Sequence, residues 1–142
     1  MLRPSDGSGV SIPMNEADLR ILLVEDHRFQ LEATQILLES YGFAHITTAD
    51  SAQVALQKMH EAALPYDILL CDQCLPDLRG LQLIEAATKL GKIKHAVLLS
   101  CLTTVELDEI AKSASKLELP LLGFLVKPPK HFELITLLTS TR

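Results

Sequence analysis

Acidic, basic and hydroxyl side chains stand where short apolar runs of this sequence end. They are Glu25 and Asp26 after the first run, Asp72 after "YDILLC", Ser100 at the end of "HAVLLS", and Lys127 after "LLGFLV". If these runs are parallel strands, their carboxyl ends meet at one edge of a sheet, where open α/β sheets bind ligands. Three carboxylates at one edge repel one another, and Mg²⁺ offsets this because it accepts carboxylates together with a phosphate oxygen. A cation, a lysine and a hydroxyl around one carboxylate predict a site that receives a phosphoryl group.

Apolar runs alternate with helical patterns along the chain. We expect strands over 20–25, 44–49, 66–71, 95–100 and 121–126, and helices over 28–40, 52–63, 81–90, 104–117 and 130–140. In the first helix Leu31, Ile36, Leu37 and Leu38 fall at helical spacing, and Ser51 can cap the second helix. Strands that are apolar throughout and alternate with helices predict an α/β fold, in which a doubly wound, five-stranded parallel sheet is covered on both faces.

The bulk composition limits the class of protein. The chain has 142 residues, 48% of them hydrophobic, and a net charge of −5, which suits a single domain with a substantial core. There is no basic patch for nucleic acid and no apolar stretch of the roughly 20 residues that a membrane span needs. We expect a cytoplasmic protein with a flexible leader at residues 1–18, because that segment is rich in Pro, Gly and Ser, and one domain over residues 19–141.

Two cysteines flank Asp72 at C-x-x-C spacing. A redox C-x-x-C motif usually opens a helix, whose dipole lowers the thiol pKa, but here Cys71 belongs to an apolar run and Cys74 to an expected loop. A zinc site would need two more soft ligands, and Cys101 is one candidate without a second. We therefore interpret the motif as an acid site that contains thiols.

The segments "VEDH", "LLCDQCLPDLRG", "LLS" and "FLVKP", in this order, resemble the receiver domain of bacterial two-component response regulators, the CheY-like family. The resemblance covers about residues 19–141. Each segment alone is a weak signal, but each lies at the proper strand end. The resemblance implies a (βα)5, flavodoxin-like fold.

The resemblance also implies a role for each residue of the site. Asp72 corresponds to the phosphoacceptor, with Pro76 four residues and Gly80 eight residues later. Glu25 and Asp26 correspond to the metal-binding acids, and the backbone carbonyl of Cys74 to a further metal ligand. Ser100 and Phe124 correspond to the switch residues. Lys127 and Pro128 match the Lys-Pro pair that follows the fifth strand in the family. We expect Lys127 on the side of the site that faces away from the metal ligands.

The sequence departs from the family pattern in three places. Glu25 stands where Asp is commoner, so its carboxylate reaches further. Cys101 stands where Ala or Gly is usual, which would narrow access for a phosphodonor. The stretch from Ser100 to Lys127 is longer than usual and is similar to receivers joined to EAL-type cyclic-di-GMP phosphodiesterase domains.

These observations favour a phosphorylatable switch. Asp72 would accept a phosphoryl group from a sensor histidine kinase or histidine phosphotransfer protein, with Mg²⁺ as cofactor. The surface of the fourth helix, fifth strand and fifth helix would then act on an output domain, an effector or a second copy in a homodimer. No enzymatic activity beyond self-catalysed phosphotransfer and slow autodephosphorylation is expected.

Two other functions remain open from the residues alone. One is a binding module of the same fold that is never phosphorylated, although an intact acidic site argues against it. The other is a nucleotide or flavin protein, which needs a phosphate-cradling loop after the first strand. The loop "EDHRF" offers acids there instead.

Overall fold

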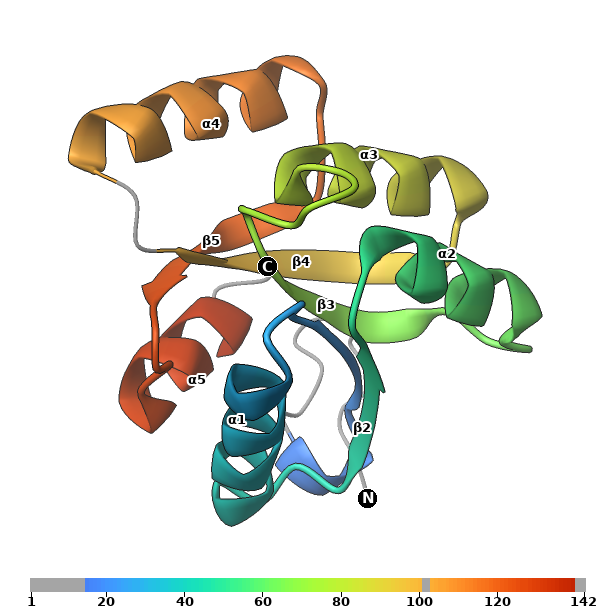
Figure 1. The fold of residues 1–142 in the computed structure, drawn as a ribbon. Coiled ribbons are helices and arrows are strands. Elements are labelled where there is room, and N and C mark those ends of the chain that lie inside the picture. Colours follow the sequence, from blue (N-terminus) through green and yellow to red (C-terminus); the bar gives the residue numbers. More distant parts are fainter. Residues whose placement is uncertain (1–14, 101–102, 140–142) are drawn as a thin grey trace, which may run out of the picture.

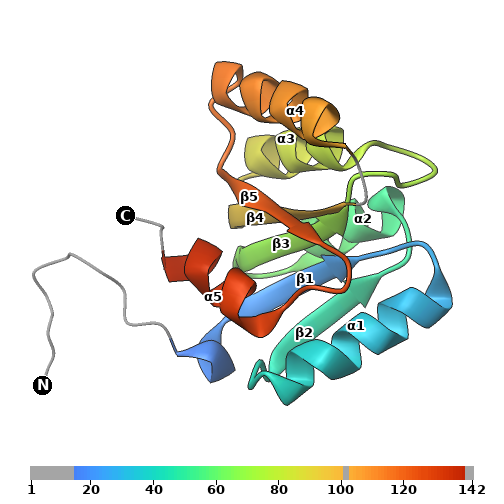
Figure 2. The same ribbon diagram turned by 90° about the vertical axis from the view of Figure 1, so that its left-hand side faces the viewer.

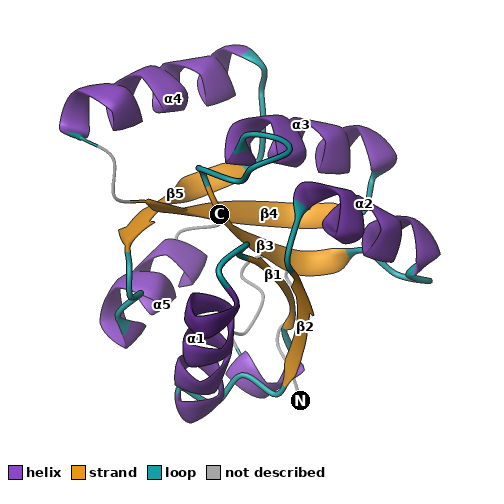
Figure 3. Cartoon of the chain, viewed as in Figure 1, coloured by secondary structure: helices purple, strands orange, loops and turns teal. Residues whose placement is uncertain are grey.

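The computed structural model describes residues 15–100 and 103–139. After a short 3-10 helix, η2 (Glu16–Asp18), strands and helices alternate without exception, as Figure 3 shows. The strands are β1 (Arg20–Val24), β2 (His45–Ala49), β3 (Tyr66–Asp72), β4 (Ile93–Ser100) and β5 (Leu121–Val126). The helices are α1 (Arg28–Ser40), α2 (Ala52–Glu61), α3 (Gly80–Leu90), α4 (Thr104–Lys116) and α5 (His131–Thr139).

The strands form one parallel sheet in the order β2-β1-β3-β4-β5. Helices α1 and α5 cover one face, and α2, α3 and α4 cover the other (Figures 1 and 2). The chain passes from β2 back across β1 to β3, which places the change of strand order beside β1 and β3. The predicted doubly wound, five-stranded α/β fold is confirmed.

The sheet separates two hydrophobic clusters, because successive side chains of a strand point to opposite faces. Leu22 and Val24 of β1 join the cluster under α2 and α3, whereas Ile21 and Leu23 join the cluster under α1 and α5. All four are fully buried or nearly so. The edge strands β2 and β5 are only partly covered, so the expectation of strands buried on both faces holds for the central strands.

Local signals set the helix boundaries. The Ser51 hydroxyl accepts a hydrogen bond from the Val54 N–H at 3.1 Å, which confirms the predicted cap of α2. Gly91 ends α3 in the left-handed conformation, with φ of 68°, where glycine carries no Cβ penalty. In α1 the predicted apolar spacing is only partly used by the core: Leu38 is fully buried, but Ile36 is 65% exposed.

The start of the described chain is ordered against the domain. Of the expected leader, residues 1–14 lie outside the described residues, while residues 16–18 form η2. The Glu16 carboxylate lies 2.7 Å from Nε2 of His131 at the start of α5. No helix among the described residues is long and apolar enough to cross a membrane.

Gly80 lets the start of α3 approach β3 more closely than any side chain would allow. A Cβ atom there would lie 2.7 Å from the Asp72 carbonyl oxygen and 2.9 Å from the Cα of Gln73. Since both are backbone atoms, they yield only if the strand moves. We expect Gly80→Ala to lower the free energy of unfolding by about 1–3 kcal/mol, as overpacking of a core does, measured by urea denaturation.

Gly91→Ala is the control for that substitution. Its Cβ would meet nothing within 4 Å, so it tests the left-handed backbone alone, at about 1 kcal/mol. A Gly80→Ala protein that unfolds at the same urea concentration as the wild type would contradict the close-approach argument.

Candidate functional site

The register of the sheet brings the predicted residues to one edge. Val24 pairs with Cys71, so Glu25 and Asp72 follow neighbouring positions of β1 and β3. Asp72 in turn pairs with Leu99, and Ser100 pairs with Val126. The residues that end β1, β3, β4 and β5 therefore share the carboxyl edge of the sheet, as the sequence predicts.

Asp72 is buried, with only 5% of its surface exposed, yet both carboxylate oxygens are hydrogen-bonded. Oδ1 accepts the backbone N–H of Cys74 at 3.0 Å. Oδ2 accepts the Lys127 ammonium at 2.9 Å. A buried carboxylate held by one neutral donor and one cation keeps a fixed direction.

Lys127 joins the two acidic parts of the site. Besides Asp72, its Nζ contacts Oε1 of Glu25 and Oε1 of Gln30, both at 3.2 Å. Burial works to lower the Lys127 pKa, but the hydrogen bonds and charges of the two carboxylates outweigh it and raise that pKa. The expectation that Lys127 faces away from the metal ligands is wrong, because the carboxylate of Glu25 reaches the ammonium.

The acidic pair after β1 is arranged unequally. Glu25 is 1% exposed and both its oxygens are engaged, Oε1 by Lys127 and Oε2 by the backbone N–H of His27 at 3.1 Å. Asp26 is different: its Oδ1 is the one buried side-chain oxygen among the described residues without a hydrogen-bond partner. Nδ1 of His27 lies 3.5 Å from this oxygen.

An unpartnered buried carboxylate oxygen is costly unless a cation meets it. Oxygen ligands from two neighbouring acids suit a hard divalent ion such as Mg²⁺. Glu25, Asp26 and His27 form the group among the described residues whose ligand atoms all lie within 4.8 Å of one another. The residues present therefore fit a divalent cation.

The two predicted switch residues occupy different depths. Ser100 ends β4 and is 4% exposed. Phe124 lies in β5, half-buried, and packs against the cluster on the α2 and α3 face. Cys101, which the sequence suggests as a restriction on access, lies outside the described residues.

Comparison with known proteins agrees with the family resemblance of the sequence. Residues 21–139 match the family model described as the response regulator receiver domain. The chain belongs to this family. Over 110 residues it is 27% identical to the chemotaxis protein CheY of Pseudomonas aeruginosa. The matched region covers 78% of this chain and 85% of that protein. It is also 34% identical over 67 residues to the two-component response regulator ARR10 of Arabidopsis thaliana. The matched region is 12% of the length of ARR10.

Solved structures agree with this assignment. A CheY-like receiver domain from Methylobacillus flagellatus superposes with a TM-score of 0.70 at 28% identity, covering 87% of this chain and 98% of that one. A receiver domain protein from Clostridium thermocellum gives a TM-score of 0.72 at 21% identity, over 87% and 93% of the two chains, which shows the shared fold. This receiver domain is thus a component of two-component signal transduction.

Among the described residues of the receiver domain, the thiols are those of Cys71 and Cys74, and they are not bonded to each other. Cys71 is fully buried, and burial, reinforced by the charge of Asp72, raises its pKa far above the ordinary value. It therefore stays a neutral thiol. Cys74 is exposed and not bonded to Cys71, and what it brings to Asp72 is its backbone N–H.

Sequence reasoning missed three supports of the receiver site. Gln73 is 5% exposed, and its Oε1 accepts the Leu81 N–H at 3.0 Å, which ties the residue after Asp72 to the first turn of α3. Gln30 adds the third oxygen around Lys127. Asp77 caps a helix to which it does not belong. Only the Asp77 position carried a signal, since Asp in a loop often accepts backbone N–H groups.

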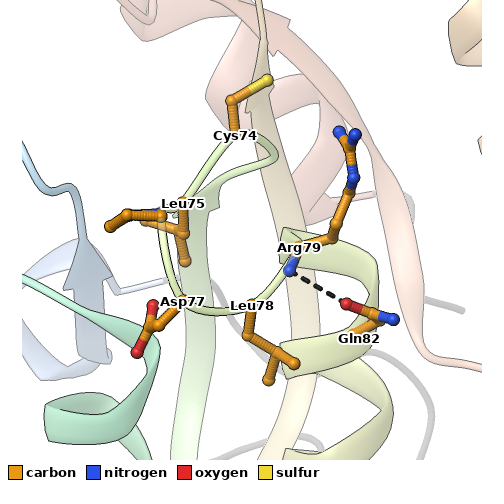
Figure 4. Close-up of a pocket in the computed structure, with 7 residues that line it drawn as sticks. Cys74, Leu75, Asp77, Leu78, Arg79 and Gln82 are labelled. Carbon is orange, nitrogen blue, oxygen red and sulfur yellow. Dashed lines mark hydrogen bonds between the residues drawn. The ribbon is translucent and has the colours of Figure 1, made fainter.

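Asp77 connects the loop after β3 to the start of α2 through two hydrogen bonds. Its Oδ1 accepts the Ala52 N–H at 3.1 Å and its Oδ2 accepts the Gln53 N–H at 2.9 Å. Figure 4 shows its carboxylate turned toward that helix and away from Arg79, whose N–H bonds to Gln82 Oε1. Slight burial works to raise the Asp77 pKa, but the backbone N–H groups lower it below its ordinary value of 3.8.

The capping carboxylate predicts a pH-dependent stability. Since the folded-state pKa is lowered, its contribution is present above the unfolded-state pKa and is lost as the pH falls through the folded-state value. At pH 7 we expect Asp77→Ala to lower the free energy of unfolding by about 1 kcal/mol, and this difference should shrink steadily below the ordinary value of 3.8. Chemical denaturation at a series of pH values measures it, with exposed Asp108→Ala as control; a difference that is constant with pH would refute the charged cap.

Proposed function

We propose that Asp72 is the phosphoacceptor of this receiver domain and that Mg²⁺ assists the transfer. The observation that carries the proposal is a buried carboxylate at the end of β3, held by Lys127 at 2.9 Å and by the Cys74 N–H at 3.0 Å. A fixed direction makes a carboxylate a better nucleophile, because the entropy of alignment is lost before the reaction.

In the proposed step, an Asp72 oxygen forms a bond to the phosphorus of a phosphohistidine. The bond from phosphorus to the histidine nitrogen breaks, and that nitrogen keeps the electron pair. Glu25, Asp26, Asp72 and the backbone carbonyl of Cys74 would hold the metal ion. When bound, Mg²⁺ neutralises charge on the phosphoryl oxygens.

Lys127 and Ser100 would bind the negatively charged phosphoryl group. The phosphoryl group adds a charge of about −1.5 to −2 and three acceptor oxygens beside a lysine that already touches Asp72. A charge-assisted hydrogen bond from Lys127 to one of these oxygens is stronger than a neutral one. Ser100 would donate its hydroxyl from the end of β4, and Phe124 would turn inward, which changes the surface formed by α4, β5 and α5.

That surface is suited to such a change. Ala114 is the buried residue of α4, and Val126 at the end of β5 is 67% exposed. Side chains with few packing partners move at little cost in free energy. The output side of the receiver is therefore the part that a small change at Asp72 can rearrange.

The family implies a phosphodonor and an output partner. We propose a sensor histidine kinase or a histidine phosphotransfer protein as donor. For the output we propose an attached domain or effector, with an EAL-type cyclic-di-GMP phosphodiesterase domain as the first candidate and a homodimer as another, in the cytoplasm. The receiver itself would catalyse only its own phosphotransfer and slow dephosphorylation.

Incubation with acetyl phosphate, with and without Mg²⁺, tests the proposed function. Intact-mass spectrometry should show one added phosphoryl group per chain when Mg²⁺ is present and none, or very little, with excess chelator. A protein of unchanged mass under both conditions would instead support the unphosphorylated binding module.

Lys127→Ala is expected to uncouple phosphorylation from the conformational response. The mass increase should persist, because Asp72 keeps its carboxylate, but the phosphoryl charge loses its partner directly after β5. With beryllofluoride, a phosphoryl mimic, the NMR shift change at the Phe124 amide should fall to less than about half of the wild-type value. Lys130→Ala, an exposed lysine nearby, is the control. A wild-type shift change in Lys127→Ala would refute the coupling.

A further inference from the structure

We propose that His27 is a third metal ligand of this receiver and that it makes the site prefer borderline transition-metal ions, such as Zn²⁺ and Co²⁺, over Mg²⁺. The inference rests on the metal site of the proposed function and adds a nitrogen donor to it. The residue follows the acidic pair directly, and its imidazole lies against both acids.

The distances around His27 match those between neighbouring ligands of one metal ion. Nδ1 lies 3.2 Å from Oε2 of Glu25 and 3.5 Å from Oδ1 of Asp26. Ligands at about 2.1 Å from an ion are separated by about 3.0 Å in an octahedron and about 3.4 Å in a tetrahedron. The two separations from Nδ1 therefore suit neighbouring positions of a coordination sphere, and one ligand atom of each residue lies within 4.8 Å of the other two.

The three ligands are also prepared for an ion in other ways. The Oδ1 atom of Asp26 is buried without a hydrogen-bond partner, so an ion would satisfy it. The Glu25 carboxylate is buried and fixed, because its Oε2 accepts the His27 backbone N–H at 3.1 Å. The His27 side chain is 69% exposed, which leaves room for water ligands on the open side.

Asp72 stands apart from this group. Lys127 lies between Glu25 and Asp72, with its Nζ 3.2 Å from the first carboxylate and 2.9 Å from the second. An ion held by Glu25, Asp26 and His27 therefore does not require Asp72 to release Lys127. The site has two sets of ligands that share the acidic pair: an oxygen set with Asp72 and a mixed set with His27.

The chemistry of the donors decides which ion each set takes. Mg²⁺ is a hard ion that is bound mainly by oxygen, whereas imidazole favours Zn²⁺, Ni²⁺ and Co²⁺. Replacing an oxygen ligand by an imidazole nitrogen thus raises the affinity for these ions and adds nothing for Mg²⁺. A receiver with Glu25, Asp26 and His27 should bind Zn²⁺ in competition with Mg²⁺.

Calorimetric titration of the full chain with Zn²⁺ and, separately, with Mg²⁺ tests this inference. His27→Asn should weaken Zn²⁺ binding by at least about tenfold and change Mg²⁺ binding by less than about threefold. Asn is a preferred helix N-cap, and His27 makes no side-chain cap bond, so α1 should persist in the variant. His45→Asn, at the opposite edge of the sheet, is the matched control and should change neither affinity.

A spectroscopic experiment identifies the ligand atoms directly. Titration with Co²⁺ should give visible absorption bands in the wild type that shift in His27→Asn, and NMR should show paramagnetic broadening of the His27 imidazole. Asp26→Asn should lose both Zn²⁺ and Mg²⁺ binding. Unchanged Zn²⁺ affinity in His27→Asn, an equal loss of both ions in it, or Zn²⁺ binding that survives Asp26→Asn would each overturn the inference.

The same samples separate this inference from the proposed function. Phosphorylation of the wild type by acetyl phosphate in Mg²⁺ tests Asp72, and it is measured separately from Zn²⁺ binding. If the wild type is phosphorylated but the Zn²⁺ affinity is the same in His27→Asn, only the inference fails. If the wild type is never phosphorylated but Zn²⁺ binding depends on His27, only the proposed function fails.

Discussion

Asp72→Asn is expected to abolish phosphoryl uptake completely while the fold survives. The amide has the same shape as the carboxylate, so its oxygen can still accept the Cys74 N–H that holds Asp72 at 3.0 Å. Lys127 would keep Glu25 as its charged partner at 3.2 Å. The proposed nucleophilic oxygen is lost, however, and neither Glu25 nor Asp26 ends β3, where we propose that the phosphoryl group binds.

Intact mass after incubation with acetyl phosphate and Mg²⁺ measures this effect, and circular dichroism confirms the fold. Asp108→Asn, an exposed acid on α4, should be phosphorylated like the wild type. Phosphoryl uptake by Asp72→Asn would mean that another side chain is the acceptor, and loss of the fold would mean that the carboxylate is structural.

Asp26→Ala should lower the rate of Mg²⁺-dependent phosphorylation by at least about a hundredfold, because a bound cation supplies several kcal/mol of charge stabilisation. Glu25→Ala should weaken metal binding but leave measurable activity. The structure gives the reason for the difference. Oδ1 of Asp26 is buried and unpartnered, whereas the Glu25 oxygens are already engaged by Lys127 and His27. An ion therefore gains more from Asp26.

Initial rates over a range of Mg²⁺ concentrations separate the two substitutions. Glu25→Ala should need more Mg²⁺ to reach its maximal rate, while Asp26→Ala should show no saturation in the accessible range. Glu32→Ala, an exposed acid on α1, is the control and should follow the wild-type curve. A wild-type rate in Asp26→Ala would show that the metal is held elsewhere.

Much of this architecture was predictable because the chain uses consistent local signals. The apolar runs that become β1, β3 and β4 have both faces buried, so their composition alone distinguishes them from surface strands. Each boundary lies within a few residues of its expected place, as with Ser51 at α2 and Gly91 at α3. The convergence of Glu25, Asp72 and Ser100 followed from one rule, that parallel strands present their carboxyl ends at the same edge.

What sequence could not provide is the direction of long side chains. The position of Lys127 at the edge was predictable, but its contact with Glu25 depends on the extra methylene of Glu compared with Asp and on the rotamers of both residues. The fit of Gly80 against the Asp72 backbone is a tertiary distance without a local signature. The cap that Asp77 provides to α2 likewise has no local signature, because Asp77 and Ala52 are 25 residues apart in the sequence.

The sparse packing of α4 has a consequence for how the receiver populates its states. Ala114 is its buried residue, and at its start the Thr103 N–H donates to Glu106 Oε1 at 3.0 Å, a bond within the helix cap itself. A helix stabilised by its own cap can shift without breaking the two cores on either side of the sheet. We therefore expect two arrangements of α4 that differ little in free energy, so that a bias of about 1.4 kcal/mol would change their ratio tenfold. Hydrogen exchange would see this as amide protons of α4 that exchange long before those of β1 and β3.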